Sequence, residues 1–264
     1  MSAKGPVPPM PALVAGAPFA LLVGRPWQTV SRSRAEEALM RMGLRPCLAS
    51  SPDQELGQPC FRVFFGDTSI LMGPASDTWL SRADPQDPKN SKIGVVVPDD
   101  WRRAGHVWHF RPEGRAVLDD GGDFYKMMLL LLDVFGATHL YWDAAALWSD
   151  AKMFRAAMRE FLISAMPPVL HMVAFRKDAD HQLYTRGLHY FAGQELAATI
   201  PAEMDVQAVV RRLARLALDV MMNGPYRTAM EVAGLDPGEV IWLYPEAAVG
   251  NQPAIVRAEI LPQI

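Results

Sequence analysis

Three aspartates follow the ends of expected strands, a position where catalytic side chains often gather. Asp99 and Asp100 come directly after the apolar run "IGVVVP", and Asp143 ends the run "THLYWD". Carboxylates that meet in a cleft could exchange protons with a substrate or hold a small molecule. The same residue type also forms turns and caps at strand ends. The sequence therefore leaves two interpretations open: a cleft lined by Asp99, Asp100 and Asp143, or three turn residues.

Two histidines, His106 and His109, have the H-x-x-H spacing that would place both rings on one face of a helix. The surrounding residues, "GHVWHFR", predict a strand, in which these two positions point to opposite faces. The chain contains neither H-E-x-x-H nor C-x-x-C. We therefore expect no metal ligands. His171 and His189 fall on the two arms of an expected hairpin, where they could face each other across the strands or be ordinary strand residues; the second interpretation is favoured.

The motifs of nucleophilic and nucleotide chemistry are missing from the sequence. It has no G-x-S-x-G, no G-x-x-x-x-G-K-[ST], and no strand followed by G-x-G-x-x-G. Cys47 and Cys60 lie in apolar segments; two buried thiols of a reducing compartment are favoured over a disulfide between them. No catalytic residue and no cofactor are predicted, so the sequence favours a role other than catalysis.

Residues suited to binding another protein are more prominent. Trp27, Trp79 and Trp101 fall in or beside loops, and exposed tryptophans often dominate protein interfaces. They could equally cover the core. A basic edge on the helix expected at 205–222 could meet an acidic partner or a phosphate chain, or could be a solvated helix face. That edge consists of Arg211, Arg212 and Arg215.

Periodicity and capping residues predict the helices that position these side chains. Apolar residues recur at helical spacing over 150–165 and over 205–222, where Asp205 is the expected N-cap and Gly224 follows the end. The run from Phe124 to Phe135 is apolar nearly all round, which is typical of a buried helix, and Gly136 ends it. Ser33 and Gly43 bracket a shorter helix.

Short β-rich runs alternate with these helices, among them "PFALLVG", "LRPCLAS", "VIWLYP" and a hairpin around Gly66. The pattern predicts an α+β fold with mixed or mainly antiparallel sheets and packed helices. Residues 1–14 are expected to form a disordered, proline-rich tail, and 15–264 a single two-lobed domain. Similar element orders suggest two pseudo-repeated, ferredoxin-like halves at 15–143 and 144–264.

Composition places the chain among ordinary globular proteins. Of its 264 residues 50% are hydrophobic and 21% charged, and the formal net charge is -3. A nucleic-acid binder usually carries a basic excess, so this balance argues against one. Proline interrupts the apolar N-terminus, and no window reaches the ~18 apolar residues that a membrane span needs. We expect a cytoplasmic protein without a membrane segment, and the oligomeric state stays open.

Four further segments are "PFALLVGRPW", "TSILMGPASDTW", "HLYWDAAALW" and "YTRGLHYFAGQELAATI". Together they resemble a bacterial domain family of unknown function. The last is similar to the family's C-terminal block of the type "tyGl..fG..Elei", through Thr185, Gly187, Leu188, Phe191, Gly193, Glu195 and Leu196. The family has no established enzyme activity and is considered alongside toxin-immunity and secretion-system accessory proteins. The resemblance therefore implies one α+β fold and a partner such as a toxin or effector.

Two functions follow as hypotheses. The first is a non-catalytic protein that binds another protein, most concretely as an immunity or accessory protein. The second is an enzyme or small-molecule binder with the aspartate cleft as its site. Nucleic-acid binding through the three arginines ranks last.

Overall fold

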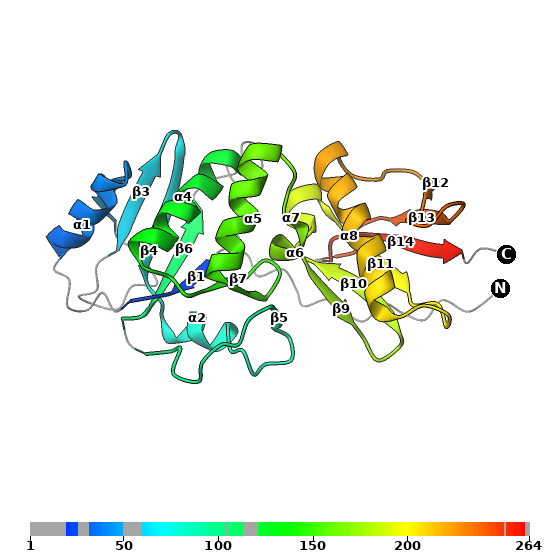
Figure 1. Ribbon diagram of the computed structural model, residues 1–264, viewed down its shortest axis with the longest axis horizontal. Coiled ribbons are helices and arrows are strands. Elements are labelled where there is room, and N and C mark those ends of the chain that lie inside the picture. The colour runs from blue at the N-terminus through cyan, green and yellow to red at the C-terminus, as the bar shows by residue number, and fades with distance from the viewer. Residues whose placement is uncertain are drawn as a thin grey trace. The chain divides into compact units, whose positions relative to one another are not determined.

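The computed structural model describes residues 20–25, 32–49, 60–103, 105–112, 121–250 and 252–261. They form two compact units, and the boundary falls between Ala174 and Phe175 (Figure 1). One sheet has eight strands and the other has six, and both are mixed and mostly antiparallel. The predicted α+β class is therefore confirmed. The expected tail at 1–14 lies outside the described residues.

Helices and strands are interspersed along the N-terminal unit, and its sheet has the strand order β2-β3-β4-β6-β1-β7-β8-β5. They are β1 (Ala20–Val23), α1 (Arg32–Arg41), β2 (Arg45–Leu48), β3 (Phe61–Phe65), β4 (Thr68–Pro74), α2 (Asp77–Arg82), β5 (Ser91–Ile93), β6 (Val107–Pro112), α4 (Gly121–Val134), β7 (His139–Trp142), β8 (Leu147–Asp150), α5 (Ala151–Ser164) and α6 (Val169–Met172).

The C-terminal unit has the strand order β12-β13-β14-β11-β10-β9. Its elements are β9 (Ala174–Lys177), β10 (Gln182–Arg186), α7 (His189–Ala192), β11 (Gln194–Thr199), α8 (Val206–Asn223), β12 (Met230–Ala233), β13 (Val240–Glu246) and β14 (Ala254–Leu261).

The core of the N-terminal unit forms around β1, which is buried along its whole length between β6 and β7. The helix α4 contributes buried Phe124, Met127 and Leu131, and it packs on α5 where the rings of Tyr125 and Phe161 meet edge to face at 5.4 Å. Gly136 follows α4 with a φ of +54°, a conformation that glycine adopts without strain. The long apolar stretch of the sequence is therefore a core helix.

Polar side chains fix the segment from Asp84 to Arg103 to this unit. The Asn90 amide donates to the backbone oxygens of Arg82 and Asp84, at 2.9 and 2.8 Å. Tyr141 donates its hydroxyl hydrogen to Asn90, and the Trp148 indole N–H donates to the Ala83 carbonyl, each at 2.8 Å. Tyr141 lies on β7 and Trp148 on β8, and the short strand β5 within the segment pairs with β8, so the segment is anchored to the sheet.

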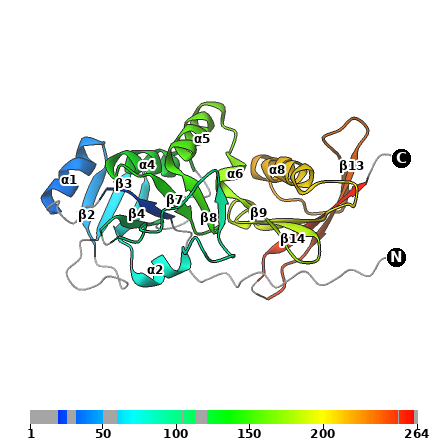
Figure 2. The same cartoon turned by 60° about the horizontal axis from the view of Figure 1, so that its bottom comes forward.

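The C-terminal unit has α8 on one face of its sheet (Figure 2). The helix begins as predicted, because an Asp205 carboxylate oxygen accepts a hydrogen bond from the Ala208 N–H at 2.5 Å. It ends before Gly224, whose φ is +92°. A buried stripe that includes Val209, Leu213 and Leu216 faces the sheet and supplies the core of this unit.

Three local predictions differ from the structure. The run "IGVVVP" contributes only its first residue to β5, and Val96 is 88% exposed, because the segment continues as irregular chain. His171 lies in α6 and His189 in α7, since the hairpin between β9 and β10 is shorter than predicted. Cys60 is buried as expected, but Cys47 is exposed because β2 is an edge strand.

The expected pair of ferredoxin-like halves is not confirmed. The two sheets differ in strand number and order. The first unit extends beyond the expected division after Asp143, because β8 pairs with β7 and α5 continues directly from β8.

Candidate functional site

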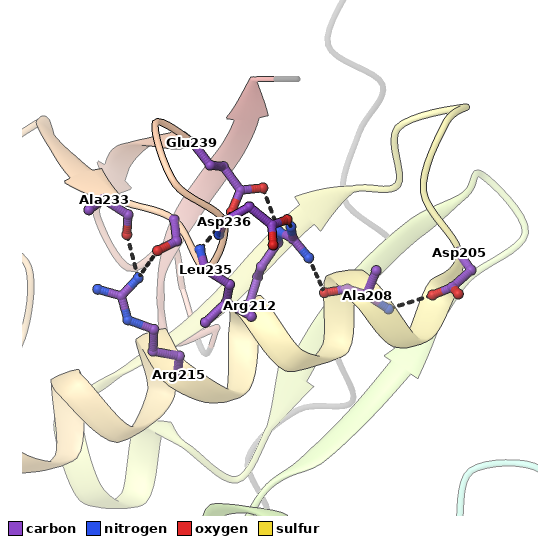
Figure 3. Close-up of polar contacts among 9 residues, drawn as sticks. Asp205, Ala208, Arg212, Arg215, Ala233, Leu235, Asp236 and Glu239 are labelled. Atoms are coloured by element: carbon purple, nitrogen blue, oxygen red, sulfur yellow. Dashed lines mark hydrogen bonds and ion pairs between the residues drawn. The ribbon is translucent and has the colours of Figure 1, made fainter. Parts of the chain in front are cut away.

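The predicted basic edge of α8 is largely an internal clasp (Figure 3). The side chain of Arg212 is buried, and its Nε donates to a Glu239 carboxylate oxygen at 2.6 Å. A second guanidinium nitrogen donates to Asp236, and Nη1 donates to the Ala208 carbonyl at 3.0 Å. Arg212 therefore ties α8 to the loop between β12 and β13.

The same loop receives Arg215, whose Nη1 donates to the carbonyls of Ala233 and Gly234 (Figure 3). Gly234 has no room for a side chain, because an added Cβ would lie 2.0 Å from Glu239 Oε2. Arg211 is exposed. Arg212 and Arg215 bind the protein's own loop. Of the three arginines in the basic edge, mainly Arg211 is therefore left to bind a phosphate chain.

Glu239 is held in its charged form by this clasp. Burial raises the pKa of the carboxyl group, but hydrogen bonds from Arg212 and from the backbone N–H groups of Leu235 and Asp236 outweigh burial and lower it. A buried ion pair of this kind contributes little over an apolar contact, yet loss of one partner strands the other. The clasp is therefore sensitive to single substitutions.

The predicted tryptophans occupy different environments. Trp101 is buried, and its ring meets Trp148 edge to face at 5.0 Å. Trp79 lies on α2 and is half-buried against the apolar cluster that contains Trp101 and Trp148. The His109 ring stacks on it with 6.4 Å between ring centres, and the Arg82 guanidinium lies 5.5 Å from its ring centre. Trp27 lies outside the described residues. Trp101 thus covers the core, and Trp79 does so in part.

The three aspartates are divided between two separate ion pairs and a turn. Asp143 pairs with Arg82 at 2.7 Å, and its carbonyl accepts from the Ala146 N–H, which closes the turn between β7 and β8. Asp99 and Asp100 lie in an exposed turn, where Asp100 pairs with Arg103 at 3.3 Å. Among the described contacts, none joins Asp143 to the other two.

The two histidines of the H-x-x-H motif contact backbone carbonyl groups. The Nδ1 atom of His106 lies 3.0 Å from the Gly24 carbonyl, and that of His109 lies 3.0 Å from the Pro74 carbonyl. Within the described ranges, no group of three or more His, Cys, Asp or Glu side chains is arranged to hold a metal ion. The helices described here include none that is both long enough and apolar enough to cross a membrane.

Sequence reasoning missed a buried carboxylate in the segment "TRGLHYFAGQEL". Glu195 is 1% exposed and accepts hydrogen bonds from the Thr185 hydroxyl at 2.6 Å and from the Gly187 N–H at 2.8 Å. His189 approaches Glu195 with its Nδ1 at 2.6 Å and its backbone N–H at 3.3 Å. The signal in the sequence is local, since Thr185, Gly187 and Glu195 lie within one stretch of eleven residues.

This carboxylate–imidazole pair has the composition of a general base, because a carboxylate on Nδ1 orients the ring. The opposite nitrogen, Nε2 of His189, is buried, and the described residues offer it no hydrogen-bond partner. A general base must reach the proton that it removes. A buried Nε2 cannot meet a substrate in this conformation, so the pair is best understood as a structural network.

Sequence reasoning also missed an exposed apolar surface at the end of α5. Ile163, Met166 and Leu170 are 89%, 55% and 47% exposed, and Leu162 is exposed beside them. The helix ends at Ser164, and Ala165 follows it in the left-handed conformation with a φ of +59°. We call Leu162, Ile163, Met166 and Leu170 the α5–α6 apolar surface. Apolar side chains gathered in this way often mark an interaction site.

Comparison with known proteins gives no relative: none of the known protein families, curated proteins or solved structures compared with the chain matches it.

Proposed function

We propose that this protein acts by binding another protein, and that its most concrete role is that of an immunity or accessory protein for a toxin or effector. The observation that carries the proposal is the α5–α6 apolar surface, where four large apolar side chains are exposed within nine residues. Exposed apolar area costs free energy in water, and a partner that covers it removes this cost.

The contacts of the cleft candidate Asp143 and of the Glu195–His189 pair favour binding over chemistry. Asp143 is paired with Arg82, and the imidazole of His189 is held by Glu195 with its free nitrogen buried. Each group has a structural task in the described structure. An enzyme would instead need a carboxylate or imidazole that can reach a substrate.

Substitution of Ile163 by Glu tests the proposal. We expect Ile163→Glu to abolish capture of a specific partner, because a carboxylate in place of the most exposed side chain of the apolar surface would be desolvated on binding. The measurement is quantitative mass spectrometry of proteins that co-purify with the tagged full chain from its native lysate. A tenfold or greater loss of one protein is expected, on the order of a central interface residue.

The matched control is Ala156→Glu, which adds the same side chain to an exposed position of the same helix outside the apolar surface. It should leave the captured partner and the unfolding midpoint unchanged. If wild type and Ile163→Glu capture the same proteins in the same amounts, the proposal fails. Co-expression then separates the finer roles, since an immunity protein must suppress the toxicity of the captured protein.

A further inference from the structure

The C-terminal unit presents a second surface, on the sheet face opposite its core. Side chains alternate along β13: Ile241 and Leu243 are buried, whereas Trp242 is half-buried and Tyr244 is 38% exposed. Successive residues of a strand point to opposite faces. Trp242 and Tyr244 therefore share the outer face, and their rings stack with 6.5 Å between centres and 18° between planes.

Carboxylates flank Trp242 on both neighbouring strands. Its cross-strand partners are Glu231 on β12 and Glu259 on β14, and both are exposed. Directly opposed residues in a sheet have their Cβ atoms about 5 Å apart on the same face. Trp242 thus lies in a row with one glutamate on each side. We call Glu231, Trp242, Tyr244 and Glu259 the aromatic–acidic row.

Two further charged groups that the register places near this row compensate each other. Arg257 is opposite Tyr244 and Glu246 is opposite Ile255, and Arg257 pairs with Glu246 at 2.6 Å. Burial and the hydrogen-bonded Glu259 raise the pKa of Tyr244, so its hydroxyl remains a neutral donor. The negative charges of Glu231 and Glu259 are therefore not cancelled by Arg257.

We propose that the aromatic–acidic row is a docking site for an extended, basic polypeptide segment. A guanidinium or ammonium group is attracted both to the face of a tryptophan ring and to a carboxylate. The row supplies both attractions from neighbouring positions. The site lies on the C-terminal unit, whereas the proposed function rests on the α5–α6 apolar surface, so either proposal can fail alone.

The spacing within the row selects an extended segment with cations at alternate positions. Trp242 and Tyr244 are two residues apart on one strand, which separates them by about 7 Å. An extended peptide repeats its side chains on one face at the same interval. A nucleic acid fits this surface poorly, because its phosphates would meet Glu231 and Glu259.

The test uses the full chain and a fluorescently labelled peptide in which arginine alternates with glycine. Binding is measured by fluorescence anisotropy at low and at physiological ionic strength. We expect Trp242→Ala to weaken binding roughly tenfold, and the double variant Glu231→Gln/Glu259→Gln to weaken it by a similar factor. Trp242→Phe should retain most of the affinity, because it keeps an aromatic face.

The matched control is Glu203→Gln, which removes one exposed carboxylate of the same unit away from the row. It should bind the peptide as the wild type does. Because Trp242 is half-buried, its alanine variant could lose stability, and the exposed double variant then decides the result alone. Equal affinity in wild type and double variant would overturn the proposal. So would equal binding of a glutamine–glycine peptide, or tighter binding of a single-stranded oligonucleotide.

Discussion

At the scale of single residues, Glu195 is the least exposed charged side chain that the structure describes, at 1%. A buried carboxylate is tolerated only when hydrogen bonds replace its hydration. Thr185, Gly187 and His189 supply these bonds from the end of β10 and from α7, while Glu195 itself lies near the start of β11. Its role is therefore to close the chain between two neighbouring strands of the same sheet.

Replacement of Glu195 tests this role. Glu195→Ala leaves the Gly187 N–H and the Thr185 hydroxyl without their acceptor, and we expect a loss of about 3 kcal/mol in the free energy of unfolding. Urea denaturation of the full chain measures it. The exposed Glu203→Ala is the matched control and should stay within about 0.5 kcal/mol of wild type. Equal stability of the two variants would show that the network is not required for the fold.

The candidate site shows where residue-level prediction stops. Arg211, Arg212 and Arg215 look alike in the sequence, and periodicity correctly placed them on one helix. The environment of Arg212 depends on Asp236 and Glu239, which follow more than twenty residues later, and that of Arg215 on the carbonyl groups of Ala233 and Gly234. No local pattern indicates that a loop will return to bind a helix. The Glu195 network and the α5–α6 apolar surface are local in the chain, but residue types alone do not tell which polar side chain is buried and which apolar one is exposed, so neither was predicted.

At the scale of elements, predictions held where the signal was local. The capping residue Asp205 and the glycines after α4 and α8 fixed helix ends that the structure reproduces. The strand β12 was missed because its residues are mostly exposed and do not alternate; its pairing with β13 determines it. The valines after Ile93 suggested a strand from composition alone, but β5 ends at Ile93 and they are not part of the described sheet.

The clasp between α8 and the β12–β13 loop predicts a pH dependence. The pKa of Glu239 is lowered below its ordinary value of 4.5 by folding, so folding favours its charged form. The unfolded chain therefore binds more protons below about pH 4.5, and the stabilisation present above that pH is lost as pH falls through the folded pKa. We expect Glu239→Gln to cost about 3 kcal/mol at pH 7, since it removes one partner of a buried pair.

Below pH 4.5 the difference in the free energy of unfolding between wild type and Glu239→Gln should narrow, because the unfolded wild-type chain binds a proton that the folded clasp disfavours, and this destabilises the wild type alone. Denaturant unfolding at pH 7, 5 and 3.5 follows this difference. Glu246→Gln is a suitable control, because its partner Arg257 is not buried. If the two proteins differ in unfolding free energy by the same amount at all three pH values, Glu239 and Arg212 do not form a charged pair.

At the scale of the whole molecule, the chain is two compact units with separate sheets and separate cores. The sequence anticipated two parts but divided them at the end of "HLYWD". The physical reason for the later boundary is strand pairing, since β8 pairs with β7 in the first sheet. The helix α5 follows β8 directly, before the strands of the second sheet begin. Short apolar runs do not reveal which sheet a strand will join, so sequence alone could not place the division.

Separate cores predict that a core substitution acts first on the unit that contains it. Trp148→Ala removes a fully buried ring from the N-terminal unit, and Leu213→Ala leaves a cavity beneath α8 in the C-terminal unit. Each should cost about 3 kcal/mol. Hydrogen exchange of the full chain, followed by mass spectrometry, should show faster exchange in 20–174 for the first variant and in 175–261 for the second. Ala156→Glu should change neither pattern, because its position is exposed. Equal acceleration across both units in either core variant would mean that the chain unfolds as one cooperative body, and that the two cores do not act as separate units.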